Sequence, residues 1–198
     1  MNLKYLADAL DYWKGGVLNF LEGRRLLDSL LVEPMLSDPE AWTGEQWSLF
    51  AGLLRVSGDQ IVRHRQSLTA DRPAYFQEIP PFETIFLDPD TGLCTSRVAS
   101  PAQYVFPEEL RSLLGGAPNR LLIVYQHVRG SVHGRLNDVT RAIQVCAPRV
   151  GCSSYESATA ALLFLSQSDR YMGVAEAFRS LLGPQYDVRV HVWRPTAV

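Results

Sequence analysis

The sequence predicts a single α/β domain in which a mostly parallel sheet is flanked by helices. Two uninterrupted apolar runs, at 84–87 and 121–124, are each followed by a helical pattern, which is typical of strands buried on both faces. Apolar and polar residues alternate strictly over 186–193, which predicts a half-exposed, antiparallel strand at or near a sheet edge. We therefore expect one domain over all 198 residues, with a helix-rich part over 1–82 and core β/α units over 83–198.

The first helix is expected near the N-terminus, where apolar residues over 3–21 recur at steps of three and four. The pair Gly15-Gly16 interrupts this pattern and could mark a break. Asp8, Asp11 and Lys14 fall at steps of three on another face of the helix. This spacing favours a solvated face with one ion pair, and the alternative is the wall of a pocket.

Further elements follow from local signals. The run 30–32 predicts a strand that stops at Glu33-Pro34, and Ser37-Asp38-Pro39-Glu40 predicts the start of a helix over about 39–55. We expect Trp42 and Trp47 of that helix to lie in the core. Further helices are expected over 107–114, 134–147 and 174–182, and a further strand over 160–165.

Composition excludes several classes of protein. The net charge is −2, with 46% hydrophobic and 20% charged residues, as in ordinary globular proteins. No segment has the roughly 20 apolar residues that span a bilayer, and acidic residues interrupt any signal peptide, so we expect a cytoplasmic protein without a membrane partner. Three cysteines without a CxxC pair argue against disulfides and zinc knuckles.

A locally basic stretch raises the question of a phosphate-bearing partner. Four arginines between His127 and Arg149 face a single acid, Asp138, and Arg129 and Arg135 are the first two of them. The planar guanidinium is a good phosphate ligand, so nucleic acid or a nucleotide is a candidate partner. The alternative explanation is a genome whose codon usage favours arginine.

Polar residues gather where the two strongest strands end. Asp88-Pro89-Asp90-Thr91-Gly92 follows the first apolar run, and Tyr125-Gln126-His127 ends the second. Ligands of open parallel sheets bind at the carboxyl ends of the strands, and polar residues there are costly unless paired or used. We therefore predict Asp88, Asp90 and His127 as catalytic candidates. The binding candidates are Pro89, Gly92, Tyr125, Gln126, Arg129 and Arg135.

Side-chain alternation refines this prediction. Tyr125 and His127 should share one face of their strand, while Gln126 takes the other. The structural alternative for the first cluster is a plain strand-to-loop turn. In that case Asp88 caps backbone amides and Gly92 supplies a position that tolerates positive φ.

From Thr84 onward, the chain resembles the second half of the class I S-adenosylmethionine-dependent methyltransferase fold. The shared order is a strand, an Asp-Pro turn, a helix, a strand, a helix and two closing strands. Most of the chain also resembles a loosely defined group of uncharacterised bacterial proteins. These combine an N-terminal stretch like Tyr5 to Lys14 with one strand that ends in Asp-Pro-Asp-Thr/Asn-Gly and another that ends in Tyr-Gln-His. The resemblance implies a reduced, Rossmann-like three-layer sandwich and a nucleic-acid- or nucleotide-associated protein with a degenerate site. In the amino-group methylating members the first residue of the motif, here Asp88, holds the target amine.

The chain departs from that pattern in two places. No GxGxG loop for the cofactor precedes Asp88, and Asp90 stands where the family motif has its second proline. The motif's aromatic residue is also missing. S-adenosylmethionine therefore has no specific motif in this sequence.

Two other functions remain open. Asp88 and Asp90 could hold Mg²⁺ in a nuclease, with Glu33, Glu78 or His127 completing an oxygen-rich site. In the third alternative the protein is a non-catalytic interaction module and both clusters are structural turns. His127 and His133 fit no common transition-metal motif, so no such metal site is predicted.

Overall fold

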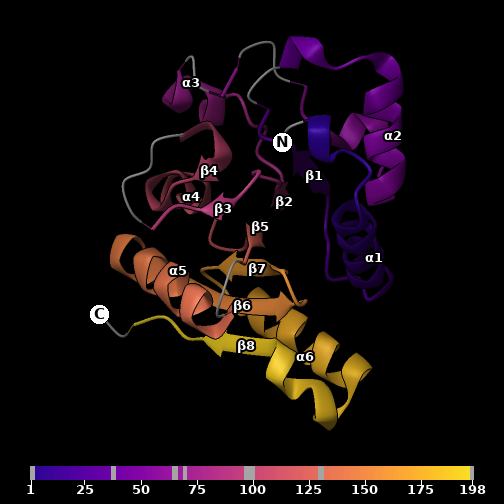
Figure 1. Ribbon diagram of the computed structural model, residues 1–198. Helices are drawn as coiled ribbons and strands as arrows, with labels where there is room; N and C mark the ends of the chain where they lie inside the picture. Colours follow the sequence, from indigo (N-terminus) through magenta and orange to yellow (C-terminus); the bar gives the residue numbers. More distant parts are fainter. Residues whose placement is uncertain are drawn as a thin grey trace.

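The computed structural model describes residues 3–36, 39–63, 67–68, 71–95, 101–128 and 132–196. They form an α/β fold around a six-stranded mixed sheet with the strand order β1-β2-β5-β7-β6-β8 (Figure 1). The strands of this sheet are β1 (Leu30–Glu33), β2 (Thr84–Leu87), β5 (Leu121–His127), β6 (Gly151–Glu156), β7 (Ala160–Ser166) and β8 (Val190–Trp193). A separate pair, β3 (Gly92–Leu93) and β4 (Tyr104–Val105), lies beside the sheet.

Four strands of the sheet point one way and two point the other. Strands β1, β2 and β5 are parallel neighbours, with Leu30 opposite Thr84 and Thr84 opposite Leu121. Strand β7 runs antiparallel to β5 and to β6, and β8 runs antiparallel to β6. The parallel strands are therefore the ones that the apolar runs predicted, and the antiparallel strand at the C-terminal edge is also confirmed.

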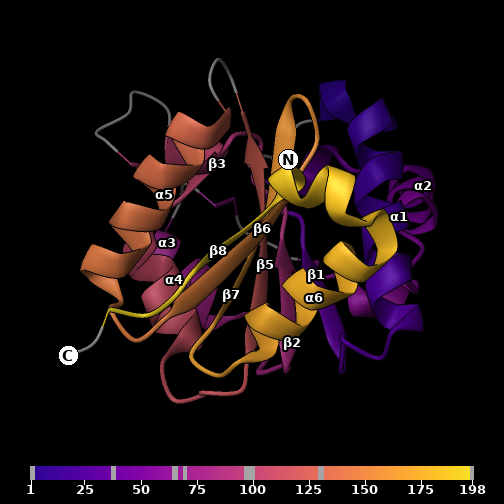
Figure 2. The same ribbon diagram turned by 90° about the horizontal axis from the view of Figure 1, so that it is seen from below.

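Six helices cover both faces of the sheet (Figure 2). Helices α1 (Ala9–Gly23), α2 (Gly44–Leu54) and α6 (Arg170–Leu182) pack on one face around Phe86 and Phe164. Helices α3 (Arg72–Gln77), α4 (Pro107–Leu114) and α5 (Val132–Cys146) pack on the other face around Ile85 and Val124. Each strand supplies alternate residues to the two apolar clusters, so both faces of the sheet are buried.

Two elements in the C-terminal part of the chain differ from the sequence prediction. Residues Pro184–Arg189 form a 3-10 helix, and the strand is limited to Val190–Trp193, because the proline favours a first helical turn over a strand. Strand β6 was not predicted. Its sequence, Gly-Cys-Ser-Ser-Tyr-Glu, is neither an apolar run nor a clear alternation, and its hairpin with β7 provides the pairing.

The predicted N-terminal helix is correct in place but not in detail. Residues Leu3–Tyr5 form a short 3-10 helix, and α1 begins at Ala9 with Asp8 as its N-cap. The expected break at Gly15-Gly16 is wrong, because α1 continues through both glycines. Gly15 lies against the backbone of α2, where a Cβ atom would overlap the carbonyl oxygen of Leu53. The glycine therefore permits close helix packing and does not end the helix.

The second helix begins later than predicted. Pro39–Ala41 form a 3-10 turn, and α2 starts at Gly44, after Thr43. The side chains of Thr43 and Gln46 bond each other's backbone N–H groups, which is a capping box. Ser37 and Asp38, the predicted cap, lie outside the described residues. Trp42 and Trp47 are buried in the core as expected, with ring centroids 4.7 Å apart.

Within the ranges given above, no helix has both the length and the apolar character that crossing a bilayer requires.

The contact of Gly15 with α2 gives a first prediction. Gly15→Ala should lower the free energy of unfolding by about 1–3 kcal/mol, because the neighbouring atom is backbone and cannot rotate away. Gly16→Ala is the matched control. Nothing lies within 4 Å of its added Cβ, and helix propensity should raise stability by about 1 kcal/mol. Urea denaturation of both variants measures the difference, and equal stabilities would contradict the packing argument.

Candidate functional site

The two predicted clusters line one cavity at the carboxyl ends of β2 and β5. Its volume is about 210 Å³. The residues that line it are Asp8, Leu10, Asp11, Lys14, Asp88, Pro89, Asp90, Thr91, Gln103, Tyr125 and His127. The sequence left open whether the Asp88 and His127 clusters come together, and in the structure they do.

Backbone pairing brings the clusters into contact. The N–H of Asp88 donates to the carbonyl of Glu33 (2.9 Å), which extends the pairing of β2 with β1 by one residue. The chain then turns back, so that the N–H of His127 donates to the carbonyl of Thr91 (2.8 Å). The loop after β2 is thereby held against the end of β5, so that Asp88, Tyr125 and His127 line the same cavity.

A buried ion triad forms the floor of the cavity. The ammonium of Lys14 donates to Oδ1 of Asp11 (2.8 Å) and to Oδ1 and Oδ2 of Asp88 (2.9 and 3.0 Å). The exposed fractions are 1% for Asp11, 5% for Lys14 and 2% for Asp88. Charges at this depth need partners, and each of the three has one.

Helix α1 positions two members of the triad. Asp8 caps the helix by accepting the N–H groups of Leu10 and Asp11 at 2.8 and 3.2 Å. Oδ2 of Asp11 accepts the N–H of Ala7 (2.9 Å), which leaves its Oδ1 for Lys14 one turn later. The spacing of three residues therefore places both side chains over the end of β2.

The pKa values in the triad follow from burial and charge. Burial alone would lower the pKa of the Lys14 ammonium, but the charges of Asp88 and Asp11 outweigh it and raise that pKa above its ordinary 10.5. Burial is also the main influence on Asp88 and raises the pKa of its carboxyl, while Lys14 opposes the rise. Lys14 is therefore a fixed positive charge at neutral pH and not a nucleophilic amine.

Tyr125 joins the triad to His127. The ammonium of Lys14 lies 4.6 Å from the centroid of the Tyr125 ring, within the range of a cation–π contact. The hydroxyl of Tyr125 lies 3.3 Å from Nδ1 of His127. Burial raises the pKa of this phenol, so the hydroxyl keeps its proton and can donate to the imidazole. Tyr125 and His127 share one face of β5, as predicted.

Gln126 faces the opposite side of β5 and does not line the cavity. Its amide accepts the N–H of Leu93 (2.9 Å) and donates to the carbonyls of Thr91 (3.2 Å) and His127 (2.8 Å). Gly92 has a φ of 120°, and a Cβ there would lie 2.6 Å from the Gln126 amide. These two predicted binding residues therefore hold the loop in shape behind the cavity.

The arginines of the basic stretch that the structure describes do not line the cavity. The guanidinium of Arg135 donates to Oγ1 of Thr95 (2.7 Å) and to the carbonyl of Leu93 (2.9 Å), on the α5 side of the sheet. Arg129 lies outside the described residues. Arg135 was predicted to bind a ligand, and its observed partners are a loop of its own chain.

The described residues among the predicted metal ligands do not form a set that could hold a metal ion. Glu33 lies at the end of β1 and accepts the hydroxyl of Tyr75 (2.5 Å) and the N–H of Met35 (2.8 Å). Both oxygens of Asp88 are bonded to Lys14. Across the described ranges, no three His, Cys, Asp or Glu side chains form a set that could hold a metal ion.

Sequence reasoning did not select Asp11 and Lys14. Their spacing with Asp8 was noted, and the solvated face that it favoured is wrong for both residues, since both are buried. The pocket wall, which was the alternative, is what the structure contains. The available signal was a charged stripe on a helix with an apolar stripe beside it, in a chain whose only other lysine is Lys4.

Comparisons with known proteins find no matching family model, no matching curated protein and no matching solved structure. The geometry of the cavity and the sequence patterns are therefore the basis of the functional proposal.

The triad predicts a strong effect of one substitution. Lys14→Met keeps the length of the side chain but leaves two buried carboxylates without a cation. The free energy of unfolding should fall by about 3–5 kcal/mol at neutral pH. Lys4→Met, at the other and exposed lysine, should change it by less than about 0.5 kcal/mol. Chemical denaturation of both variants checks the prediction, and similar losses would contradict it.

The stability of Lys14→Met relative to the wild type should also depend on pH. Without the ammonium, burial and the neighbouring Asp11 hold the pKa of Asp88 above its ordinary value of 3.8. A carboxyl with a raised folded-state pKa destabilises the fold above that pKa, and the penalty disappears as the pH falls through it. The stability gap between Lys14→Met and the wild type should therefore narrow as the pH falls through the raised pKa of Asp88. A gap that stays constant or widens would exclude this explanation.

Proposed function

We propose that the cavity binds the amino-bearing edge of a nucleobase, and that the protein acts on or binds nucleic acid or a nucleotide. The observation that carries the proposal is the meeting of both strand-end clusters, including Asp88, Asp90 and His127, in one cavity of about 210 Å³. A concave site with convergent polar groups and residues of shifted pKa is the usual form of a small-ligand site.

The charge of the cavity supports a ligand that donates hydrogen bonds. Four aspartates and one lysine line it. Ionised carboxylates only accept hydrogen bonds, and the amino groups of adenine and cytosine are donors. The same acidic lining disfavours a phosphate inside the cavity, so the base would enter first and the phosphate would stay outside.

The residues divide into two roles under this proposal. Asp88 is almost inaccessible and holds Lys14, so it acts by fixing the floor of the cavity. Asp90 and His127 are half-buried and line the cavity above that floor. Asp90 would therefore accept the amino group of the base, while His127 offers a hydrogen bond to the ring.

The arrangement of strands supports the resemblance to the methyltransferase fold. Strand β2, which ends in the Asp-Pro turn, is followed across the sheet by β5 and then by the antiparallel β7. Helices on both faces of the sheet are also compatible with the Rossmann-like three-layer sandwich that this resemblance implies. Fold similarity alone does not carry activity, so the proposal rests on the cavity.

The residues present do not fit S-adenosylmethionine. Strand β1 ends in Glu33 and is followed by Pro34-Met35, without glycine. The Glu33 carboxylate accepts hydrogen bonds from the hydroxyl of Tyr75 and the N–H of Met35. We therefore derive no methyl-transfer step for this chain. Mg²⁺ at Asp88 is also not favoured, because Lys14 already bonds both carboxylate oxygens where the ion would bind.

A matched ligand series tests the proposal. Adenosine and cytidine should raise the melting temperature by several degrees, whereas inosine and uridine, which carry a keto group in the same place, should raise it little. Asp90→Asn keeps the size of the side chain but turns an acceptor-only group into a partial donor, so it should abolish the difference. Glu176→Gln, at an exposed acid on α6, is the control and should bind like the wild type.

The alternatives make distinct predictions in the same assay. A response to Mg²⁺ or Mn²⁺ alone would favour the nuclease. No response to any nucleoside, nucleotide or metal ion would favour the interaction module. Equal shifts with adenosine and inosine would show that the amino group is not recognised, and would overturn the proposal in its present form.

A further inference from the structure

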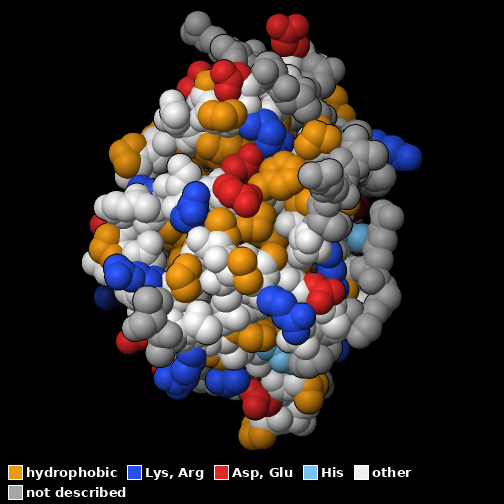
Figure 3. Space-filling view, turned by 90° about the vertical axis from the view of Figure 1, so that its left-hand side faces the viewer, with side chains coloured by type: hydrophobic (Ala, Val, Ile, Leu, Met, Phe, Trp, Pro, Cys, Tyr) orange, Lys and Arg blue, Asp and Glu red, His pale blue; other side chains and the backbone are white. Residues whose placement is uncertain are grey.

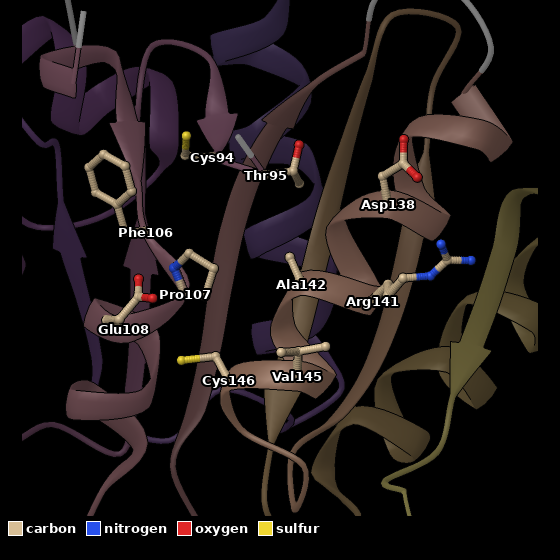
Figure 4. Close-up of a pocket in the computed structure, with 10 residues that line it drawn as sticks. All are labelled: Cys94, Thr95, Phe106, Pro107, Glu108, Asp138, Arg141, Ala142, Val145 and Cys146. Atoms are coloured by element: carbon tan, nitrogen blue, oxygen red, sulfur yellow. The ribbon is translucent and has the colours of Figure 1, made fainter. Parts of the chain in front are cut away.

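A second concave surface lies on the other face of the sheet, away from the proposed base-binding cavity. It is a groove of about 660 Å³ between α4 and α5, shown in Figure 4. Phe106 and Pro107 line it on the side of α4, and Asp138, Arg141 and Val145 line it on the side of α5 (Figure 4). The surrounding surface carries hydrophobic side chains among charged ones (Figure 3).

Val145 is unusually exposed for its type. Its exposed fraction is 81%, the highest among the large hydrophobic side chains of the described residues. It lies beside Ala142, whose small side chain leaves the helix surface open to close approach. A solvated helix face does not need a valine in this position, whereas a helix that packs in the groove would cover it.

Two opposite charges on the same face lack partners. Asp138 and Arg141 are exposed and lie one turn apart on α5. Neither makes an ion pair or hydrogen bond with any other described residue. Figure 4 shows both side chains extending outward from α5. The face therefore offers one positive and one negative group to a partner.

The order of these residues is complementary to itself. Gly134, Asp138, Arg141 and Val145 are all exposed and follow at steps of four, three and four, which is the spacing of a straight helix seam. If two such helices lie antiparallel about a twofold axis, Asp138 of each copy meets Arg141 of the other. Val145 then lies over Gly134 of the second copy, which has no side chain of its own.

We propose that this groove is the interface between two copies of the chain, with the α5 helices packed antiparallel and paired through Asp138 and Arg141. The complementarity of charge under twofold symmetry favours a second copy over an unrelated helix. A helix pair of this length buries less than the roughly 1,600 Å² of a standard interface. The dissociation constant of the dimer should therefore lie in the micromolar range, so the fraction of dimer should rise with protein concentration.

Light scattering after size-exclusion chromatography tests the proposal over a concentration series. The wild-type mass should rise from 22.2 kDa toward twice that value. Asp138→Arg and Arg141→Asp should each weaken association by about tenfold or more, because like charges then face each other twice. An equimolar mixture of the two variants should associate again, because every arginine of one copy meets an aspartate of the other.

Two further variants complete the design. Glu176→Arg reverses an exposed acid on α6 and should leave the association unchanged. Val145→Asp places a charge in the seam at a residue that is already exposed, so it should give a folded monomer. A wild type that stays monomeric throughout, or single reversals that dimerise like the wild type, would overturn the proposal.

Discussion

The fold depends on one ammonium group held between two buried carboxylates. Lys14 comes from the first long helix and Asp88 from the end of a central strand, and they are 74 residues apart in the sequence. Because all three charges of the triad are almost inaccessible, none can be left without a partner at moderate cost. The triad therefore fixes the position of α1 over the carboxyl end of the sheet. Gly15, the next residue in the chain, allows the same turn of α1 to approach α2 closely.

The same triad determines the chemistry of the cavity. It commits both oxygens of Asp88 to Lys14, which removes the strongest predicted site residue from direct contact with a ligand. Under the proposed function, the half-buried groups above it, Asp90 and His127, are the ones that would meet a ligand. Tyr125 links the triad to His127, since its ring contacts the Lys14 ammonium and its hydroxyl contacts the His127 imidazole.

The two faces of the sheet carry separate surfaces. On the face of α1, strand ends and helix together form the acidic cavity. On the face of α5, Gln126 and Arg135 secure the loop after β2 and leave the outer surface of the helix to contact a partner. Strict alternation along β5 separates these surfaces, because adjacent residues of a strand point to opposite faces. The division of Tyr125 and His127 from Gln126 therefore follows from strand periodicity alone.

The sequence by itself determined the α/β class and the strands with uninterrupted apolar runs, and it predicted the polar clusters that follow two of them. Long apolar runs leave few alternatives for β2 and β5, and polar residues directly after them must lie at a sheet edge. Strand β6 was missed because its sequence has no strand pattern, and backbone pairing with β7 and β8 forms it. Only the tertiary structure decided that Asp11 and Lys14 are buried against Asp88. A helical spacing states which residues share a face, but what covers that face depends on contacts between segments far apart in the chain.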